Sequence, residues 1–199
     1  MLLLGRIIPL VPSRFTIRAA LPSDVPVLRQ LIDSSVRLLQ SQDYSPQQID
    51  SALRTVFGVD SQLIGDGTYL LVETVPAASD GKPPVIVACG GWSKHKTLFG
   101  GDRWHDRQDD LLDPIRDAAK IRAFFIHPDW ARQGIGTLLL DACELAARAV
   151  GFTRFEMGAT LTGVKLFQQR GYVALERLEV PLEGDITLPI VHMVKGTAR

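Results

Sequence analysis

Two glycines and an arginine stand at the start of a strongly patterned segment. Arg132, Gly134 and Gly136 follow an apolar run that ends near residue 126. From Gly134 onward, apolar residues recur every three or four positions, which predicts an amphipathic helix to about Val150. The first N–H groups of a helix have no partner within it and lie at the positive end of its dipole. Because glycines leave these groups uncovered, the spacing favours a site for phosphate or pyrophosphate.

Glycines before a helix also serve as plain turn residues, so the pattern alone leaves both readings open. Two other phosphate-binding loops are excluded by the sequence. There is no G-x-x-x-x-G-K-[ST] segment, and the third glycine of the dinucleotide fingerprint is missing after Gly136. The sequence therefore supports neither a P-loop nor a Rossmann site.

The elements around this turn follow from composition and periodicity. Apolar and aromatic residues predict a strand that leads into the turn, and several other segments have the same composition. Ser23 and Ser45 are expected N-caps of two helices, the second running from Pro46 to about Gly58. Gly90-Gly91 suggests a bulge or close backbone approach, or else a plain strand end. The expected strands are 15–18, 68–75, 84–92, 121–126, 152–157, 173–182 and 188–195, with a short helix at 161–170.

Length and composition favour one domain in a reducing compartment. With 199 residues and 46% hydrophobic content, the chain can bury a single core, which we place at 15–199 after an N-terminal extension, 1–14. Twenty-two basic residues balance twenty-two acidic ones, which argues against nucleic acid or an anionic membrane as principal partner. Cys89 and Cys143 fall in apolar segments and are expected to be reduced. No segment suggests a membrane span or a metal site, so we expect a soluble, cytoplasmic protein.

Residues 93–119 form a long polar insertion that has two interpretations. Five of its six aspartates, at positions 102, 106, 109, 110 and 113, would attract a cationic substrate. Alternatively, the segment is a solvated loop held by its aromatic residues, Phe99 and Trp104. We favour the second interpretation for most of the aspartates.

The order of elements resembles the GNAT superfamily of N-acetyltransferases. The segment FFIHP, the glycines at 134 and 136, and the LF-QQR-GY segment some thirty residues later fall where that family has its two main motifs. The resemblance covers 118–180 well and the rest through element order. It implies an α/β (α+β) fold: one mixed, mostly antiparallel sheet of about seven strands with flanking helices. A V-shaped opening between strands four and five would hold acetyl-coenzyme A as co-substrate.

The resemblance also implies roles for particular residues. The N–H groups of 132–137 would hold the pyrophosphate, and Arg132 and Lys165 would neutralise phosphates. Strand residues 124–126 would pair with the pantetheine arm. The cofactor-binding residues expected on this basis are Phe124, Phe125, Ile126, Arg132, Gln133, Gly134, Ile135, Gly136, Thr137, Thr160, Lys165 and Phe167.

The implied reaction is direct attack by a primary amine, on a small molecule, peptide or protein, on the thioester. Candidates for the general base or for binding the amine are Glu156, Asp102 and Asp113, although water frequently serves in the family. Phe167 stands where many members have a tyrosine that protonates the thiolate, and Ala131 replaces the usual glutamine or arginine. Phe167, together with Lys120 where the family commonly has a carboxylate, leaves an alternative, a non-catalytic acyl-coenzyme A binding or sensor module. An unrelated α/β domain without coenzyme is a third reading, and a homodimer is compatible with the sequence.

Overall fold

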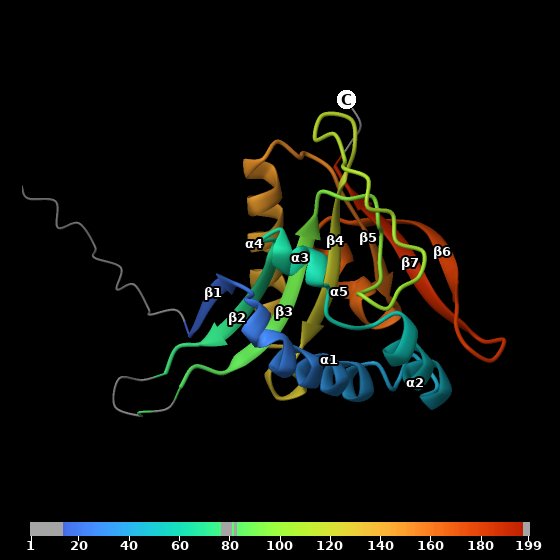
Figure 1. Cartoon of the computed structure of the whole chain (residues 1–199), viewed down its shortest axis with the longest axis horizontal. Coiled ribbons are helices and arrows are strands. Elements are labelled where there is room, and N and C mark those ends of the chain that lie inside the picture. The colour runs from blue at the N-terminus through green and yellow to red at the C-terminus, as the bar shows by residue number, and fades with distance from the viewer. Residues whose placement is uncertain (1–13, 77–80, 82, 197–199) are drawn as a thin grey trace, which may run out of the picture.

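The computed structural model describes residues 14–76, 81 and 83–196, which are built around one central sheet (Figure 1). The strand order is β1-β2-β3-β4-β5-β7-β6, and all neighbours are antiparallel except β4 and β5. This confirms the predicted mixed, mostly antiparallel sheet of seven strands. The strands are β1 (Phe15–Ala19), β2 (Tyr69–Thr74), β3 (Ile86–Ser93), β4 (Ala119–Ile126), β5 (Phe155–Thr160), β6 (Val173–Pro181) and β7 (Thr187–Lys195).

Helices cover both faces of the sheet. The longest, α4, packs on one face, and α1, α2 and α3 lie on the other (Figure 1). The α-helices are α1 (Val25–Leu39), α2 (Pro46–Thr55), α3 (Ser61–Gly65), α4 (Ile135–Ala149) and α5 (Val164–Gln169). Short 3-10 turns are η1 (Pro22–Asp24), η2 (Pro128–Trp130) and η3 (Leu161–Gly163).

Alternate strand residues divide between two hydrophobic cores. On β2, Tyr69 and Leu71 join the core under α1 to α3, whereas Leu70 and Val72 face the core under α4. This follows from the two-residue period of a strand, whose side chains point alternately to opposite faces. Cys89 lies in the first core and Cys143 in the second; both are free thiols, as expected, and burial raises the pKa of Cys89 to about 12.

The starts and ends of several elements differ from the sequence-based expectation. Ser23 was expected to cap the first helix, but it lies within η1, and the Asp24 carboxylate instead accepts the Leu21 N–H at 2.7 Å. Ser45 is a true N-cap, because its Oγ accepts the Gln48 N–H at 3.2 Å. Helix α2 ends at Thr55 rather than near 58, β5 is 155–160 rather than 152–157, and α3 was not predicted because five residues are too few to show a period.

A β-bulge interrupts β4 opposite the glycine pair of β3. The register with β3 shifts between Cys89 and Gly91, and Ala123 has a φ of 53°. Close approach accompanies it, because a Cβ at Gly90 would lie 2.4 Å from the Phe124 ring. The bulge changes the alternation of β4, so that Ile121 and Phe124, three residues apart, both face the core under α4.

The polar insertion is a folded loop rather than a regular element. The loop closes on itself, since the N–H of Thr97 donates to the Gln108 carbonyl at 3.1 Å. It is fixed to the body where the Gly101 N–H donates to the Val56 carbonyl at 2.8 Å. Trp104 is 8% exposed and belongs to the core under α1 to α3. Its aromatic residues thus hold the loop, as expected.

Two expectations remain predictions. All but one residue of the proposed N-terminal extension, 1–14, lies outside the described residues. Within the part of the chain that is described, none of the helices has the length and apolar character needed to cross a membrane. Cytoplasmic location stays a prediction.

Candidate functional site

The sheet opens between β4 and β5. These two parallel strands pair only at Ala119 with Phe155 and at Lys120 with Glu156. Beyond these pairs a cavity of about 540 Å³ lies between the strands and is lined also by α1, the start of α4, α5 and the insertion loop. This is the predicted V-shaped opening.

The N-terminus of α4 forms one wall of the cavity. Gly134 is its N-cap residue with a φ of 82°, and no side chain caps the helix. Arg132, two residues earlier, also has a left-handed φ of 64°. A Cβ at Gly134 would meet no atom within 4 Å, so the helix start faces open space. Unpaired N–H groups at the positive end of a helix dipole are suited to an anion.

The second glycine of the motif has a different role from the first. A Cβ at Gly136 would lie 2.9 Å from Cδ2 of Leu166, a residue of α5. Gly136 therefore lets α4 and α5 approach each other. The sequence pattern assigned both glycines to phosphate access, because it does not show which neighbour each one meets.

Nearly all of the expected cofactor-binding residues line this one cavity. The exception is Gln133, whose Nε2 donates to the Asp129 carbonyl at 3.4 Å. The Ile126 N–H on the β4 side of the opening donates to Ser35 Oγ at 3.3 Å. The expected residues that line the cavity are Phe124, Phe125, Ile126, Arg132, Gly134, Ile135, Gly136, Thr137, Thr160, Lys165 and Phe167.

Phe167 presents a ring, without a hydroxyl, to the cavity. It packs edge-on against Phe124 and Tyr172, with ring centroids 6.0 and 5.9 Å apart. The Tyr172 hydroxyl donates to Glu144 Oε1 at 3.0 Å in a buried position, and burial raises its pKa well above the ordinary value. Tyr172 does not line the cavity. It is a core aromatic residue, as its sequence position indicated.

The three candidate carboxylates lie outside the cavity lining. Asp102 accepts the N–H and hydroxyl of Ser61 at 2.7 and 2.8 Å, and Asp113 accepts the Ile115 N–H at 2.9 Å. Both therefore organise loops.

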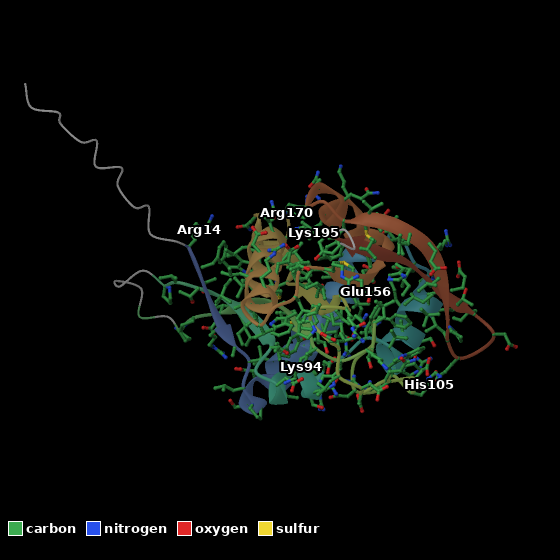
Figure 2. All side chains as sticks on the ribbon, turned by 90° about the horizontal axis from the view of Figure 1, so that it is seen from above. Arg14, Lys94, His105, Glu156, Arg170 and Lys195 are labelled. Atoms are coloured by element: carbon green, nitrogen blue, oxygen red, sulfur yellow. The ribbon has the colours of Figure 1, made fainter. Side chains whose placement is uncertain are left out.

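Glu156 lies on β5, whose later residues line the cavity. It contacts Lys120 Nζ and lies 2.8 Å from His192 Nε2. It shares a face of β5 with Gly158, which lines the cavity. In Figure 2, Glu156 lies nearer the centre of the molecule, whereas His105 of the insertion loop is at its outer edge.

The structure adds two polar residues that the sequence did not single out. Gln40 and Arg122 line the cavity and are buried, and neither has all its polar atoms satisfied: Gln40 Oε1, Arg122 Nε and Arg122 Nη1 have no partner. Arg122 interrupts the apolar run IRAFFI of β4, and this charge inside a buried strand was the available signal. Gln40 gave no comparable signal.

Comparison with known proteins agrees with this geometry. Residues 112–193 match the family model described as an acetyltransferase (GNAT) domain. The resemblance noted from the sequence is confirmed over this segment of the chain. No curated protein matches the chain.

Solved structures share the whole fold at low identity. A GCN5-related N-acetyltransferase from Rhodopseudomonas palustris is 23% identical with a TM-score of 0.64, covering 93% of this chain and 97% of the other. The PaiA N-acetyltransferase of Thermoplasma acidophilum, in complex with coenzyme A, is 14% identical with a TM-score of 0.58 over 93% and 100% of the chains. A ribosomal-protein-alanine N-acetyltransferase from Brucella melitensis is 16% identical with a TM-score of 0.55, over 92% and 99%. At these identities the likeness establishes the fold.

Proposed function

We propose that this chain, which carries a GNAT acetyltransferase domain over residues 112–193, transfers an acetyl group from acetyl-coenzyme A to a primary amine. The observation that carries the proposal is the opening between β4 and β5, which runs to the uncapped start of α4 at Gly134. A coenzyme A-bound relative with the same fold supports the choice of co-substrate.

The cofactor is expected to lie along the cavity with its phosphates at α4. The N–H groups of residues 132–137 would donate to the pyrophosphate, where the helix dipole favours negative charge. Arg132 and Lys165 line the same region and would neutralise phosphate charge. The pantetheine arm would follow the edge of β4 at residues 124–126, beside Thr160 and Phe167.

The amine would attack the thioester carbonyl carbon directly. The new C–N bond forms as the carbonyl becomes a tetrahedral oxyanion, which N–H groups near Phe125 would stabilise. Collapse then breaks the C–S bond and releases coenzyme A as a thiolate. A thiol with a pKa of about 8.5 leaves tolerably without an acid near neutral pH, so the phenyl ring of Phe167 is compatible with turnover.

A second candidate is a non-catalytic acyl-coenzyme A sensor. It is favoured by one observation: among the described residues, the cavity lining includes no carboxylate, histidine, tyrosine or cysteine. Binding of acetyl-coenzyme A without release of free thiol, over a broad panel of amines, would support the sensor against the enzyme.

Gly134 tests the cofactor site. We expect Gly134→Ala to weaken acetyl-coenzyme A binding at least about tenfold in calorimetry, because the methyl group would enter the space reserved for phosphate. Gly151→Ala is the matched control, since Gly151 also has a left-handed φ, of 102°, but does not line the cavity. Equal affinity in the Gly134 variant, or no binding by the parent protein, would overturn the proposal.

A further inference from the structure

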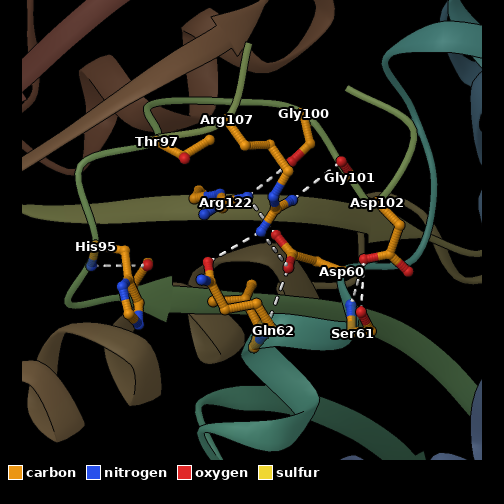
Figure 3. Close-up of polar contacts among 12 residues, drawn as sticks. Asp60, Ser61, Gln62, His95, Thr97, Gly100, Gly101, Asp102, Arg107 and Arg122 are labelled. Carbon is orange, nitrogen blue, oxygen red and sulfur yellow. Dashed lines mark hydrogen bonds and ion pairs between the residues drawn. The ribbon is translucent and has the colours of Figure 1, made fainter. Parts of the chain in front are cut away.

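A buried charge cluster lies where the cavity begins along β4, just beyond the last residue of β4 that pairs with β5. Arg122 of β4 contacts Asp60 through Nη2 and donates from the same nitrogen to the Gly100 carbonyl at 2.8 Å. Arg107 of the insertion loop donates to Asp60 Oδ1 at 3.2 Å. Figure 3 shows the two arginines converging on this one carboxylate from different elements.

In direct contact with one another, the buried groups of this cluster are two guanidinium groups and one carboxylate. The side chains of Arg122 and Asp60 are 0% exposed, and that of Arg107 is 16% exposed. Two guanidinium groups therefore share one buried carboxylate. A further carboxylate, Asp109, lies 4.0 Å from Arg107 Nε but is 69% exposed, so solvent screens it. Asp102 accepts hydrogen bonds from Ser61 and keeps its negative charge, which acts on Arg122 without direct contact.

Arg122 is also short of hydrogen-bond partners. Its Nε and Nη1 are buried without any partner, although the residue lines the cavity. Burial lowers the pKa of the guanidinium from its ordinary value, yet arginine remains charged in proteins. A buried charge with unpaired donors is costly, and an incoming acceptor oxygen with negative charge would remove both costs.

The surroundings of Arg122 suit the body of a small molecule. Apolar residues line the cavity around it from the insertion loop, the end of α2 and β7. The phosphates of the cofactor are expected at the other end, at Gly134. The apolar lining residues on this side are Val56, Phe57, Leu98, Phe99 and Ile190.

We propose that the acceptor is an amine that carries a carboxylate, as an amino acid does, and that this carboxylate accepts hydrogen bonds from Arg122 Nε and Nη1. This inference rests on the proposed acetyl transfer. It restricts the acceptor to amines that carry a carboxylate on an otherwise apolar molecule. Arg122 then fixes the carboxylate and so positions the amine towards the thioester, while the acetyl transfer itself is unchanged.

The test compares phenylalanine with phenylalaninamide and phenethylamine, which have the same ring but no carboxylate. We expect phenylalanine to have a kcat/KM at least about tenfold higher, measured by thiol release. Phenylalaninamide is the stricter comparison, because its amine is neutral at lower pH than the amine of phenylalanine. Without a carboxylate site, the amide would therefore react faster than phenylalanine. An aminoalkyl phosphonate serves as a separate arm; a preference for it over phenylalanine would contradict a carboxylate site.

Variants assign the preference to Arg122. We expect Arg122→Met to lose the preference while its affinity for acetyl-coenzyme A stays within about threefold of the parent. Arg116→Met is the matched control, since Arg116 is 85% exposed and outside the cavity lining. If the Arg122 variant does not fold, 3-phenylpropionate and its amide are compared as ligands of the coenzyme A-loaded parent protein by calorimetry. The acid is expected to bind at least about tenfold more tightly.

The outcomes separate this inference from the proposed function. No binding of acetyl-coenzyme A would overturn the proposed function. Binding and turnover without preference for the carboxylate would overturn only the role of Arg122. If the protein proves to be a sensor without turnover, the calorimetric comparison still tests the carboxylate site at Arg122. Equal binding of 3-phenylpropionate and its amide would contradict that site.

Discussion

The ionisable side chains that line the cavity, within the described part of the chain, are all basic: Arg122, Arg132 and Lys165. A positive charge disfavours the ammonium form of a nearby amine, and the neutral amine is the reactive species. No lining residue is suited to accept the proton. The proton is therefore expected to leave to water, before or during attack.

This arrangement predicts a pH profile set by the acceptor. For two amines of different pKa, kcat/KM should rise with pH up to the pKa of each amine, so the two profiles should be separated by the difference between those values. Glu156→Gln should lower kcat/KM less than about tenfold, whereas removal of a positioned base costs about 10² to 10⁴. A single common pKa for both amines, lost in the Glu156 variant, would identify Glu156 as the base.

For single residues, the sequence predicted backbone geometry, such as the helix start at Gly134, better than the contacts of side chains. Gly134 could be found from its spacing, because a helix start is a local feature. The surroundings of Glu156, Asp102 and Asp113 depend on Lys120, Ser61 and Ile115, and for Glu156 and Asp102 these contacts join distant parts of the chain. Such pairings are set by tertiary packing, which composition and periodicity do not encode.

Among the elements, the connection between α1 and α2 positions the exit of β5. The hydroxyl of Tyr44 donates to the Pro189 carbonyl and accepts the Leu161 N–H, each at 2.8 Å. Leu161 directly follows Thr160, which lines the cavity. One buried hydroxyl thus links the α1–α2 connection to β7 and to the wall of the site.

Removing that hydroxyl should destabilise the fold. We expect Tyr44→Phe to lower the free energy of unfolding by about 1–3 kcal/mol at pH 8, because two buried polar groups lose their partner. Urea denaturation followed by fluorescence measures this difference. A variant as stable as the parent would show that water or a rearranged backbone satisfies both groups.

The same residue gives a pH dependence of stability. Burial raises the pKa of Tyr44 to about 12, against about 10 in an unfolded chain. This contribution is fully present below pH 10 and is lost as the pH rises towards 12, because only the unfolded chain then loses the proton. The parent should therefore lose more stability between pH 10 and 12 than Tyr44→Phe.

Elements with a clear period were predicted, and irregular ones were not. Ser45 and the following proline predict the start of α2. At 22–24 a 3-10 turn forms in place of the expected Ser23 cap, because Asp24 binds Leu21 and Arg18. The bulge at Ala123 was indicated only indirectly, by Gly90-Gly91 on the neighbouring strand. Its effect on the alternation of side chains along β4 depends on the pairing of two strands and could not be derived from either one.

In the whole molecule, the insertion loop completes the cavity and belongs to the core. Trp104 packs against Phe99, with ring centroids 5.1 Å apart, and Gly100 leaves room for it, since a Cβ there would lie 2.5 Å from its side chain. We expect Trp104→Ala to lower the free energy of unfolding by about 3–5 kcal/mol and to expose the loop to protease cleavage.

Ile115→Ala is the control for this prediction. Ile115 lies in the same loop but is 88% exposed, so its loss should change stability by less than about 0.5 kcal/mol. Thermal or urea denaturation measures both variants. Protection of the loop in the Trp104 variant would contradict its role as an anchor.

At this largest scale the order of elements predicted the topology, because helices and strands follow one another in a recognisable sequence. The polar composition of 93–119 left two interpretations, a site for a cationic substrate and a solvated loop, since carboxylates in sequence do not reveal whether they are bound. The end of the cavity that we propose for the acceptor is built from that loop, from β4 and from the segment before α3. These segments are distant in the sequence, so the site was not predictable from any one of them.

The short ladder between β4 and β5 also bears on the stability of the protein, if coenzyme A binds in the opening as proposed. The pantetheine arm of coenzyme A would pair with β4 where β5 does not. A ligand at a hundred times its Kd stabilises a fold by about 2.7 kcal/mol. Such a difference changes the fraction of molecules that quality-control proteases can degrade. When acetyl-coenzyme A is scarce, we expect the protein to have a shorter lifetime.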